Sequence, residues 1–185
     1  MLLPARFLSA LAERPEVEKI HLVVSAGASQ VLRHELGREQ TRAADLVERA
    51  GLTEGADKVQ IHRDSELDAP IASGSYPLAG TVVLPCSAGT LGALAGGSAR
   101  TLVHRAGAVA LKEGWPLILG FRETPLSLVH LENLRRLAYM GTIILPPIPA
   151  FYVGGESLER FVDHYALRVM DRLGLPSGDS DLRWG

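Results

Sequence analysis

The sequence predicts an α/β fold in which helices cover both faces of a doubly wound, mostly parallel sheet. Helical and strand-like segments alternate along the chain, and the strands are short apolar runs. The composition, 46 % hydrophobic but only 5 % aromatic, is typical of aliphatic α/β layers. Strands joined through helices need right-handed crossovers, which place helices on both faces. A chain of 185 residues suits one domain with its own core.

Helices are predicted where apolar residues recur at helical spacing and a stop signal follows. The first helix carries Phe7, Leu8 and Leu11 and is stopped by Pro15. A later helix, from Ser127, is expected to place four leucines on one face: Leu128, Leu131, Leu134 and Leu137. The predicted helices span Ala5–Arg14, Ser29–Leu36, Ala43–Ala50, Leu91–Ala95, Thr101–Lys112, Ser127–Tyr139 and Ser157–Leu173.

Strands are predicted where short β-branched or apolar runs lie between turn residues. Pro85 is expected to end one of them, because proline cannot donate to a sheet ladder. The predicted strands are Lys19–Ser25, Val59–His62, Thr81–Leu84, Pro116–Phe121 and Thr142–Leu145. Ligands of parallel sheets bind beyond the carboxyl ends of the strands, so the polar residues there are the candidates for function.

Composition argues against several classes of protein. The net charge of −2 gives no sign of a nucleic-acid or membrane surface, and no apolar run approaches the roughly 18 residues of a membrane span. The single cysteine, Cys86, allows no internal disulfide and reads as a small buried hydrophobe. The six histidines show no metal-ligand spacing, so no metal is expected. A cytoplasmic location fits this pattern.

The stretch from Gly80 to Gly97 reads as a buried strand, a turn of small residues and a helix N-terminus. Such a corner directs backbone N–H groups and the positive end of the helix dipole beyond the sheet. Ser87 and Thr90 add hydroxyls, and Gly89, Gly92, Gly96 and Gly97 allow close approach to the backbone. Ala88 and Gly89 offer mainly backbone contacts. The corner could form the floor for a flat, phosphorylated cofactor; the alternative is an ordinary turn with an N-cap serine.

Arg122 and Glu123 directly follow a predicted buried strand. The arginine could bind phosphate or a flavin carbonyl through its planar fork, and the carboxylate could move a proton. The alternative is an ion pair at the rim that caps the helix starting at Ser127.

Two further pairs could bind a phosphate. Arg105 and Lys112 are seven residues apart on one predicted helix, two turns along one face. Tyr152 follows a Pro-rich loop, and Arg168 lies beside the apolar stripe of the last helix. The alternatives are a solvated helix face, a packed loop tyrosine and a surface arginine.

Several fragments together resemble the UbiX-type flavin prenyltransferases, over roughly residues 6–184. The fragments are Ser73-Gly-Ser-Tyr, Pro85-Cys-Ser-Ala-Gly-Thr-Leu, Arg105-Ala-Gly-Ala-Val-Ala-Leu-Lys-Glu, Arg122-Glu-Thr-Pro-Leu and Pro146-Pro-Ile-Pro-Ala-Phe-Tyr. The resemblance implies a Rossmann-like (flavodoxin-like) fold and a single flavin-binding domain over residues 1–185. It also implies a transferase that joins the dimethylallyl group of dimethylallyl phosphate to reduced FMN, without a metal. The product would serve a UbiD-type decarboxylase, and family members are commonly homododecamers.

The resemblance also implies roles for individual residues. Glu123 would be catalytic, assisting proton movement. FMN would be bound by Ser25, Ser87, Ala88, Gly89, Thr90 and Arg122. The prenyl phosphate would be held by Arg105, Lys112, Tyr152 and Arg168, some of them from neighbouring subunits.

The sequence departs from the family at its start. The family's first strand and its Gly-Ala-Ser-Gly loop, which contributes to FMN binding, do not precede the first predicted helix, and we expect a wrongly chosen start codon. Two other functions remain open: a related FMN-dependent cysteine decarboxylase, whose catalytic histidine and Asn/Met-rich motif we do not find, and a non-catalytic flavin-binding subunit.

Overall fold

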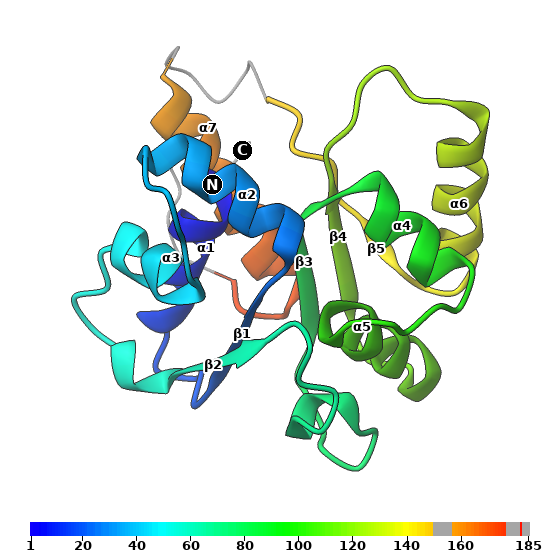
Figure 1. Cartoon of the computed structure of the whole chain (residues 1–185), viewed down its shortest axis with the longest axis horizontal. Coiled ribbons are helices and arrows are strands. Elements are labelled where there is room, and N and C mark those ends of the chain that lie inside the picture. Colours follow the sequence, from blue (N-terminus) through cyan, green and yellow to red (C-terminus); the bar gives the residue numbers. More distant parts are fainter. Residues whose placement is uncertain (150–156, 177–181, 183–185) are drawn as a thin grey trace. The chain divides into compact units, whose positions relative to one another are not determined.

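The computed structural model describes residues 1–149, 157–176 and 182 (Figure 1). The chain divides into two compact units, and each has a sheet and a hydrophobic core of its own. Unit 1 comprises Met1–His62 and Ile148–Gly185, and unit 2 comprises Arg63–Pro147. One flavin-binding domain over residues 1–185 stays a prediction.

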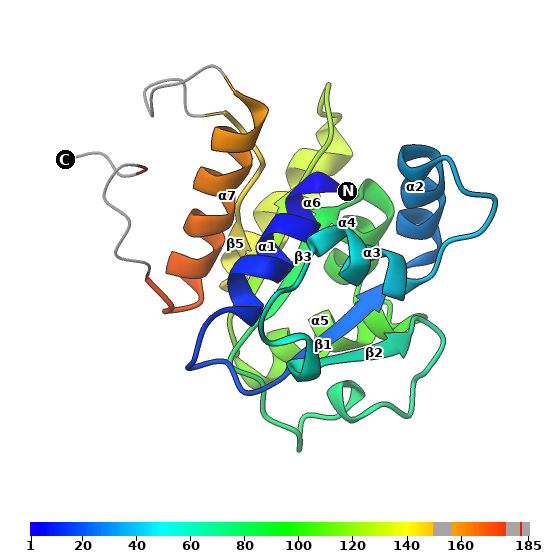
Figure 2. The ribbon, with the colours of Figure 1, turned by 90° about the vertical axis from the view of Figure 1, so that its left-hand side faces the viewer.

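Unit 1 has a two-stranded sheet, β1–β2, and helices that pack on one another. Its elements are α1 (Leu2–Ala12), β1 (Ile20–Val24), α2 (Ala26–Leu36), α3 (Ala43–Ala50), the 3-10 helix η1 (Ala56–Lys58), β2 (Val59–Arg63) and α7 (Leu158–Arg172). Helix α1 contacts both α3 and α7, and Figure 2 shows α7 lying alongside it. The core of the unit includes Leu8, Ile20, Leu32 and Leu46.

The end of α1 is fixed by the segment around η1. The Lys58 ammonium donates to the carbonyls of Ala12 and Arg14, at 2.9 and 2.8 Å, and so satisfies acceptors that a helix end leaves free. Gly55 lies against the same carbonyl: a Cβ there would be 2.3 Å from Ala12 O. Its φ of +71° also favours glycine.

Two histidines on β1 and β2 form a stacked pair. His21 Nδ1 and His62 Nε2 are 2.9 Å apart, the ring centroids are 5.1 Å apart, and His62 is buried. Burial, followed by the charges of His62 and Lys19, lowers the pKa of His21. Folding therefore favours the neutral form of His21 over the charged form.

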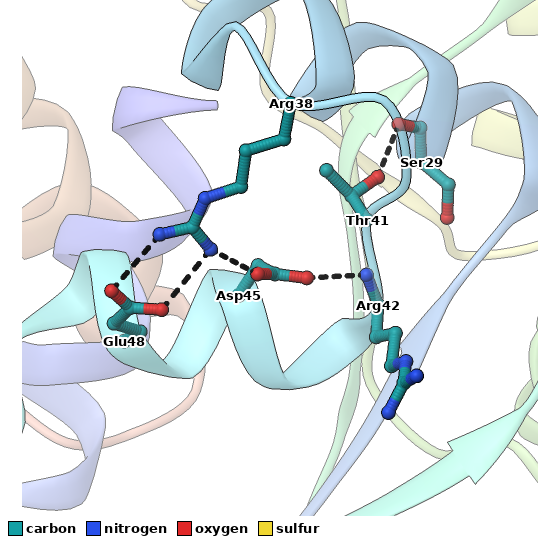
Figure 3. Close-up of polar contacts among 6 residues, drawn as sticks. All are labelled: Ser29, Arg38, Thr41, Arg42, Asp45 and Glu48. Carbon is teal, nitrogen blue, oxygen red and sulfur yellow. Dashed lines mark hydrogen bonds and ion pairs between the residues drawn. The ribbon is translucent and has the colours of Figure 1, made fainter.

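The connection between α2 and α3 is held by polar contacts rather than by apolar packing (Figure 3). The Arg38 guanidinium donates to Asp45 and, at 3.1 and 3.2 Å, to both carboxylate oxygens of Glu48. Thr41 donates to the carbonyl of Ser29 at 2.7 Å. Hydrogen bonding to Arg38 also lowers the pKa of Glu48. This cluster orders a surface loop.

Unit 2 contains a three-stranded parallel sheet in the order β3–β4–β5. Its elements are the 3-10 helix η2 (Pro70–Ala72), β3 (Thr81–Cys86), α4 (Ala88–Ala95), α5 (Leu102–Glu113), β4 (Leu117–Phe121), α6 (Leu128–Tyr139) and β5 (Ile143–Ile144). All five residues of β4 are buried, as expected for the central strand. The predicted alternation of parallel strands and helices is confirmed here.

Strand β3 differs from its predicted end. It continues through Pro85 to Cys86, with the Leu84–Pro85 peptide bond in the cis form. The pairing with β4 shifts register between Val83 and Cys86. The expectation that Pro85 ends the strand was wrong, because an irregular stretch of ladder accommodates a residue that cannot donate.

Helices α1, α2 and α4 each begin three residues earlier than predicted, and in α2 and α4 the reason is a capping serine. The Ser25 hydroxyl accepts from the N–H of Ala28, and the Ser87 hydroxyl accepts from that of Thr90, each at 3.2 Å. The predictions started α2 and α4 at Ser29 and Leu91. Within the described ranges, we find no helix with the length and apolar character that crossing a membrane requires.

Helix α6 corrects another expectation. Leu137 is fully buried and Leu134 packs against the same core, whereas Leu128 and Leu131 are 70 % and 49 % exposed. The four leucines therefore do not share one face. At 3.6 residues per turn, a step of three residues is a sixth of a turn short of a full turn. Three such steps add up to half a turn, so Leu128 and Leu137 lie on opposite sides of the helix.

Candidate functional site

The corner after β3 has the geometry of an anion-binding turn. Ser87 caps α4, and its hydroxyl also donates to the Thr90 hydroxyl at 3.2 Å. The first-turn N–H groups of Ala88 and Gly89 have no acceptor within the helix. Gly89 is exposed, and a Cβ there would approach nothing closer than Ser87 Oγ at 3.8 Å. The space above these amides is open to a ligand.

Arg122 and Glu123 lie beside this corner, at the carboxyl end of β4. The N–H of Arg122 donates to the carbonyl of Cys86 at 3.3 Å, which joins the two strand ends. Both side chains are exposed. The Glu123 carboxylate accepts from the N–H of Thr124 at 3.2 Å, so it is directed back over its own turn.

The N-terminus of α6 is capped by its own residues. The Ser127 hydroxyl accepts from the N–H of His130, and His130 Nδ1 accepts from the N–H of Ser127, both at 3.2 Å. The His130 ring also contacts Phe121 edge-on, with centroids 5.8 Å apart. A capping role for Arg122 and Glu123 is therefore not needed.

Arg105 and Lys112, from opposite ends of α5, reach the same short segment. Arg105 Nε donates to the carbonyl of Ala72 at 2.8 Å. The Lys112 ammonium pairs with Glu113 at 2.5 Å, and a Cβ on Gly74 would lie 2.9 Å from this nitrogen. The structure thus brings both predicted phosphate ligands against residues 72–74.

Two exposed hydroxyls lie in and directly after residues 72–74, those of Ser73 and Ser75, 2.7 Å apart. Eight residues before Ala72, the Asp64 backbone carbonyl and carboxylate accept from the N–H groups of Leu102 and Val103, at 2.7 and 3.0 Å, and tie this part of the chain to the start of α5. The sequence reasoning missed Asp64 and Glu113. The only sign in the sequence was Gly74 between two serines. A glycine there suggests that another group packs closely against the backbone, but it does not identify that group.

In unit 1, Ser25 caps α2, as described above. Arg168 is half-buried on α7, with Nη1 4.0 Å from Asp171. Burial, then the Arg168 charge, lowers the pKa of the neighbouring His164, while Asp171 opposes this shift. Tyr152 lies outside the described residues.

Cys86 is fully buried, and burial raises its pKa to about 12, so the thiol is not an activated nucleophile. Among the described residues, no group of three or more histidine, cysteine or acidic side chains is arranged to hold a metal ion. The chemistry available in unit 2 is therefore that of backbone amides, hydroxyls, two arginines, a lysine and a carboxylate. These groups suit phosphates and a flat polar ring system.

Comparison with known proteins places the chain among flavoproteins. The model of the Flavoprotein family matches residues 5–161. The flavin prenyltransferase UbiX of Pseudomonas aeruginosa is 38 % identical over 97 % of this chain and 86 % of its own length. That of Synechocystis is 44 % identical over 84 % of this chain and 78 % of its own.

Two solved structures are similar over nearly the whole chain. A dodecameric FMN-dependent UbiX-like decarboxylase from Escherichia coli O157:H7 is 39 % identical with a TM-score of 0.84, over 99 % of this chain and 92 % of the other. AnUbiX in complex with FMN and dimethylallyl pyrophosphate is 34 % identical, also with a TM-score of 0.84, over 100 % and 90 %.

The protein is thus a flavoprotein of α/β architecture. Within that class, the chain belongs to the UbiX-type flavin prenyltransferase family. The predicted family, fold class and flavin cofactor are confirmed.

Proposed function

We propose that this protein is a flavin prenyltransferase that joins a dimethylallyl group to reduced FMN. The observation that carries the proposal is that unit 2 holds two separate features: the open α4 N-terminus beside Arg122, and the cations of α5 directed at residues 72–74. The first suits a flavin, and the second suits the phosphate of a prenyl donor.

Each side chain then has a physical task. Ser25, Ser87, Ala88, Gly89, Thr90 and Arg122 bind FMN. Arg105, Lys112, Tyr152 and Arg168 hold the donor phosphate. When the allylic C–O bond breaks, its electron pair leaves on the phosphate oxygen, and these three cations and one hydroxyl donor stabilise that charge.

Reduced flavin supplies the nucleophilic N5 and C6 atoms. Glu123 is the catalytic residue that accepts and returns a proton near N5, since it is an exposed carboxylate beside Arg122. The donor is dimethylallyl phosphate; the AnUbiX complex with the diphosphate makes both esters worth testing. We further propose a UbiD-type decarboxylase as recipient of the product, a homododecamer as the working assembly, and a cytoplasmic location.

The test is anaerobic incubation of the purified chain with reduced FMN and either dimethylallyl ester, followed by mass spectrometry of the flavin. We expect flavin carrying one added prenyl group, and its loss in Glu123→Gln with FMN still bound. If the parent binds FMN and leaves it unchanged with both esters, the non-catalytic flavin-binding alternative is favoured and the proposal fails.

A further inference from the structure

The charged heads of Lys112 and Glu113 meet at the C-terminal end of α5. The Lys112 ammonium is 2.5 Å from Glu113 Oε1, and the Glu113 side chain is the more enclosed of the two, 30 % exposed against 59 %. Both heads lie against the backbone of Gly74, where a Cβ would be 2.0 Å from the carboxylate oxygen and 2.9 Å from the ammonium. The carboxylate is therefore held between the lysine and the segment of residues 72–74.

Helix geometry by itself does not account for this pair. Side chains of successive helical residues point about 100° apart and do not face each other. Glu113 is also the last residue of α5, where the helix dipole disfavours a negative charge. The two heads meet where both pack against Gly74. The contact thus belongs to the site around residues 72–74 rather than to the stability of the helix.

The carboxylate lies where an incoming phosphate needs the lysine. The proposed donor phosphate binds Lys112 together with Arg105, whose Nε reaches the Ala72 carbonyl at 2.8 Å. An ammonium that is paired with a carboxylate is partly neutralised, and a second anion brought to the same ammonium is repelled by the first. A phosphate must therefore displace the Glu113 carboxylate from Lys112 or bind against its charge.

We infer that Glu113 is an internal counter-ion that competes with phosphate for Lys112. In the free protein it holds the lysine against residues 72–74. The donor displaces it, because the donor also contacts Arg105 and binds through its prenyl group. The inorganic phosphate left after transfer has lost the prenyl contacts, so the return of the carboxylate to Lys112 favours its release. Glu113 is thus a positioning residue that acts through Lys112, and the inference rests on the proposed function for the place of the phosphate.

The test measures the binding of inorganic phosphate to the full purified chain by titration calorimetry. Glu113→Gln should bind phosphate about two- to fivefold more tightly than the parent, since the cost of breaking an exposed ion pair is removed. Glu113→Asp keeps the charge and should tighten binding less. Inhibition of the transferase by added phosphate should strengthen in Glu113→Gln by the same factor, and KM for dimethylallyl phosphate should fall with it.

Glu132→Gln is the matched control, because it removes the same charge from an exposed position on α6. It should leave the phosphate affinity unchanged. Thermal melting checks folding: Glu113→Gln should melt within about 2 °C of the parent, because it exchanges an exposed ion pair for a more favourable helix end.

A double variant tests whether Glu113 acts through the lysine. In the Lys112→Met background, Glu113→Gln should tighten phosphate binding less than it does in the parent, because the ammonium that both anions seek is gone. An equal gain in both backgrounds would overturn the inference. So would an unchanged or weaker phosphate affinity in Glu113→Gln, or a parent that binds no phosphate at millimolar concentration.

This inference and the proposed reaction can fail separately. Tighter phosphate binding by Glu113→Gln, with no prenylated flavin formed by the parent, would refute the reaction and leave the inference standing. A parent that prenylates FMN, but whose phosphate affinity does not respond to Glu113→Gln, would refute the inference alone.

Discussion

Gly74→Ala tests whether residues 72–74 position the phosphate-binding lysine. The new Cβ would lie 2.0 Å from the Glu113 carboxylate oxygen and 2.9 Å from the Lys112 nitrogen. To reach ordinary contact, the oxygen must move by about 1.5 Å and the nitrogen by about 0.6 Å. Both are ends of flexible side chains, and Lys112 is 59 % exposed. The fold should therefore lose no more than about 1 kcal/mol, the upper value for an exposed ion pair.

We expect Gly74→Ala to weaken the binding of the prenyl donor. Loss of up to about 1 kcal/mol of positioning corresponds to a rise in KM for dimethylallyl phosphate of roughly two- to fivefold, with kcat little changed. Lys112→Met removes a charge-assisted hydrogen bond altogether. It should therefore lower kcat/KM by roughly 10- to 100-fold, corresponding to about 1.5–3 kcal/mol.

Gly107→Ala, on the same helix as Lys112, is the control variant that should change stability and leave KM unchanged. Its Cβ would lie 2.7 Å from the buried Leu94 side chain, so overpacking should lower the melting temperature while KM stays the same. Steady-state kinetics and thermal melting of Gly74→Ala, Lys112→Met and Gly107→Ala separate an effect on donor binding from an effect on stability. An unchanged KM in Gly74→Ala would refute the positioning argument, and so would an equal rise of KM in Gly107→Ala.

Other local contacts give predictions for stability and pH. Ser87→Ala removes the cap of α4 and should cost about 1 kcal/mol and weaken FMN binding measured by fluorescence titration. Gly55→Ala should lower the free energy of unfolding in urea by about 2–4 kcal/mol, because its Cβ meets a backbone carbonyl at 2.3 Å and its φ is +71°. Acidification from about pH 7 to about pH 5 should destabilise the chain, because the pKa of His21 is lowered on folding.

Each of these has its own control. The Ser157 hydroxyl caps α7 by accepting from the N–H of Arg160 at 3.1 Å. Ser157→Ala should therefore lower stability and leave the affinity for FMN unchanged. Gly37→Ala shares the positive φ but meets nothing within 4 Å, so it should cost clearly less than Gly55→Ala. A similar loss in both would show that the contact with the carbonyl is unimportant.

The sign of the pH effect follows from proton uptake. Below the ordinary histidine pKa of about 6.5, the unfolded chain protonates His21 more readily than the folded chain does. Stability is therefore fully present above that pH and falls as the pH drops toward the lowered pKa of the folded state. His21→Gln should flatten the profile, and the exposed His34→Gln should not. A parent whose stability is constant over this range would contradict the assignment.

Features that depend on near neighbours in the chain could be predicted from the sequence. Alternating apolar runs specify the strands and helices, and serine caps act within three residues, as at Ser87 and Ser127. The five fragments around Ser73, Pro85, Arg105, Arg122 and Pro146 together identified the family, and polar groups such as Arg122 and Glu123 are expected at the carboxyl end of a strand.

Contacts between groups that are far apart in the chain could not be predicted and were found in the folded molecule. The approach of Gly74 to Lys112 and Glu113, and the pairing of His21 with His62, join residues about forty positions apart, and no local spacing encodes such contacts. The outward direction of Leu128 also depended on the fold. Helix α6 carries apolar residues on two sides, and its packing in the core of unit 2 selects the side of Leu134 and Leu137 as the buried one.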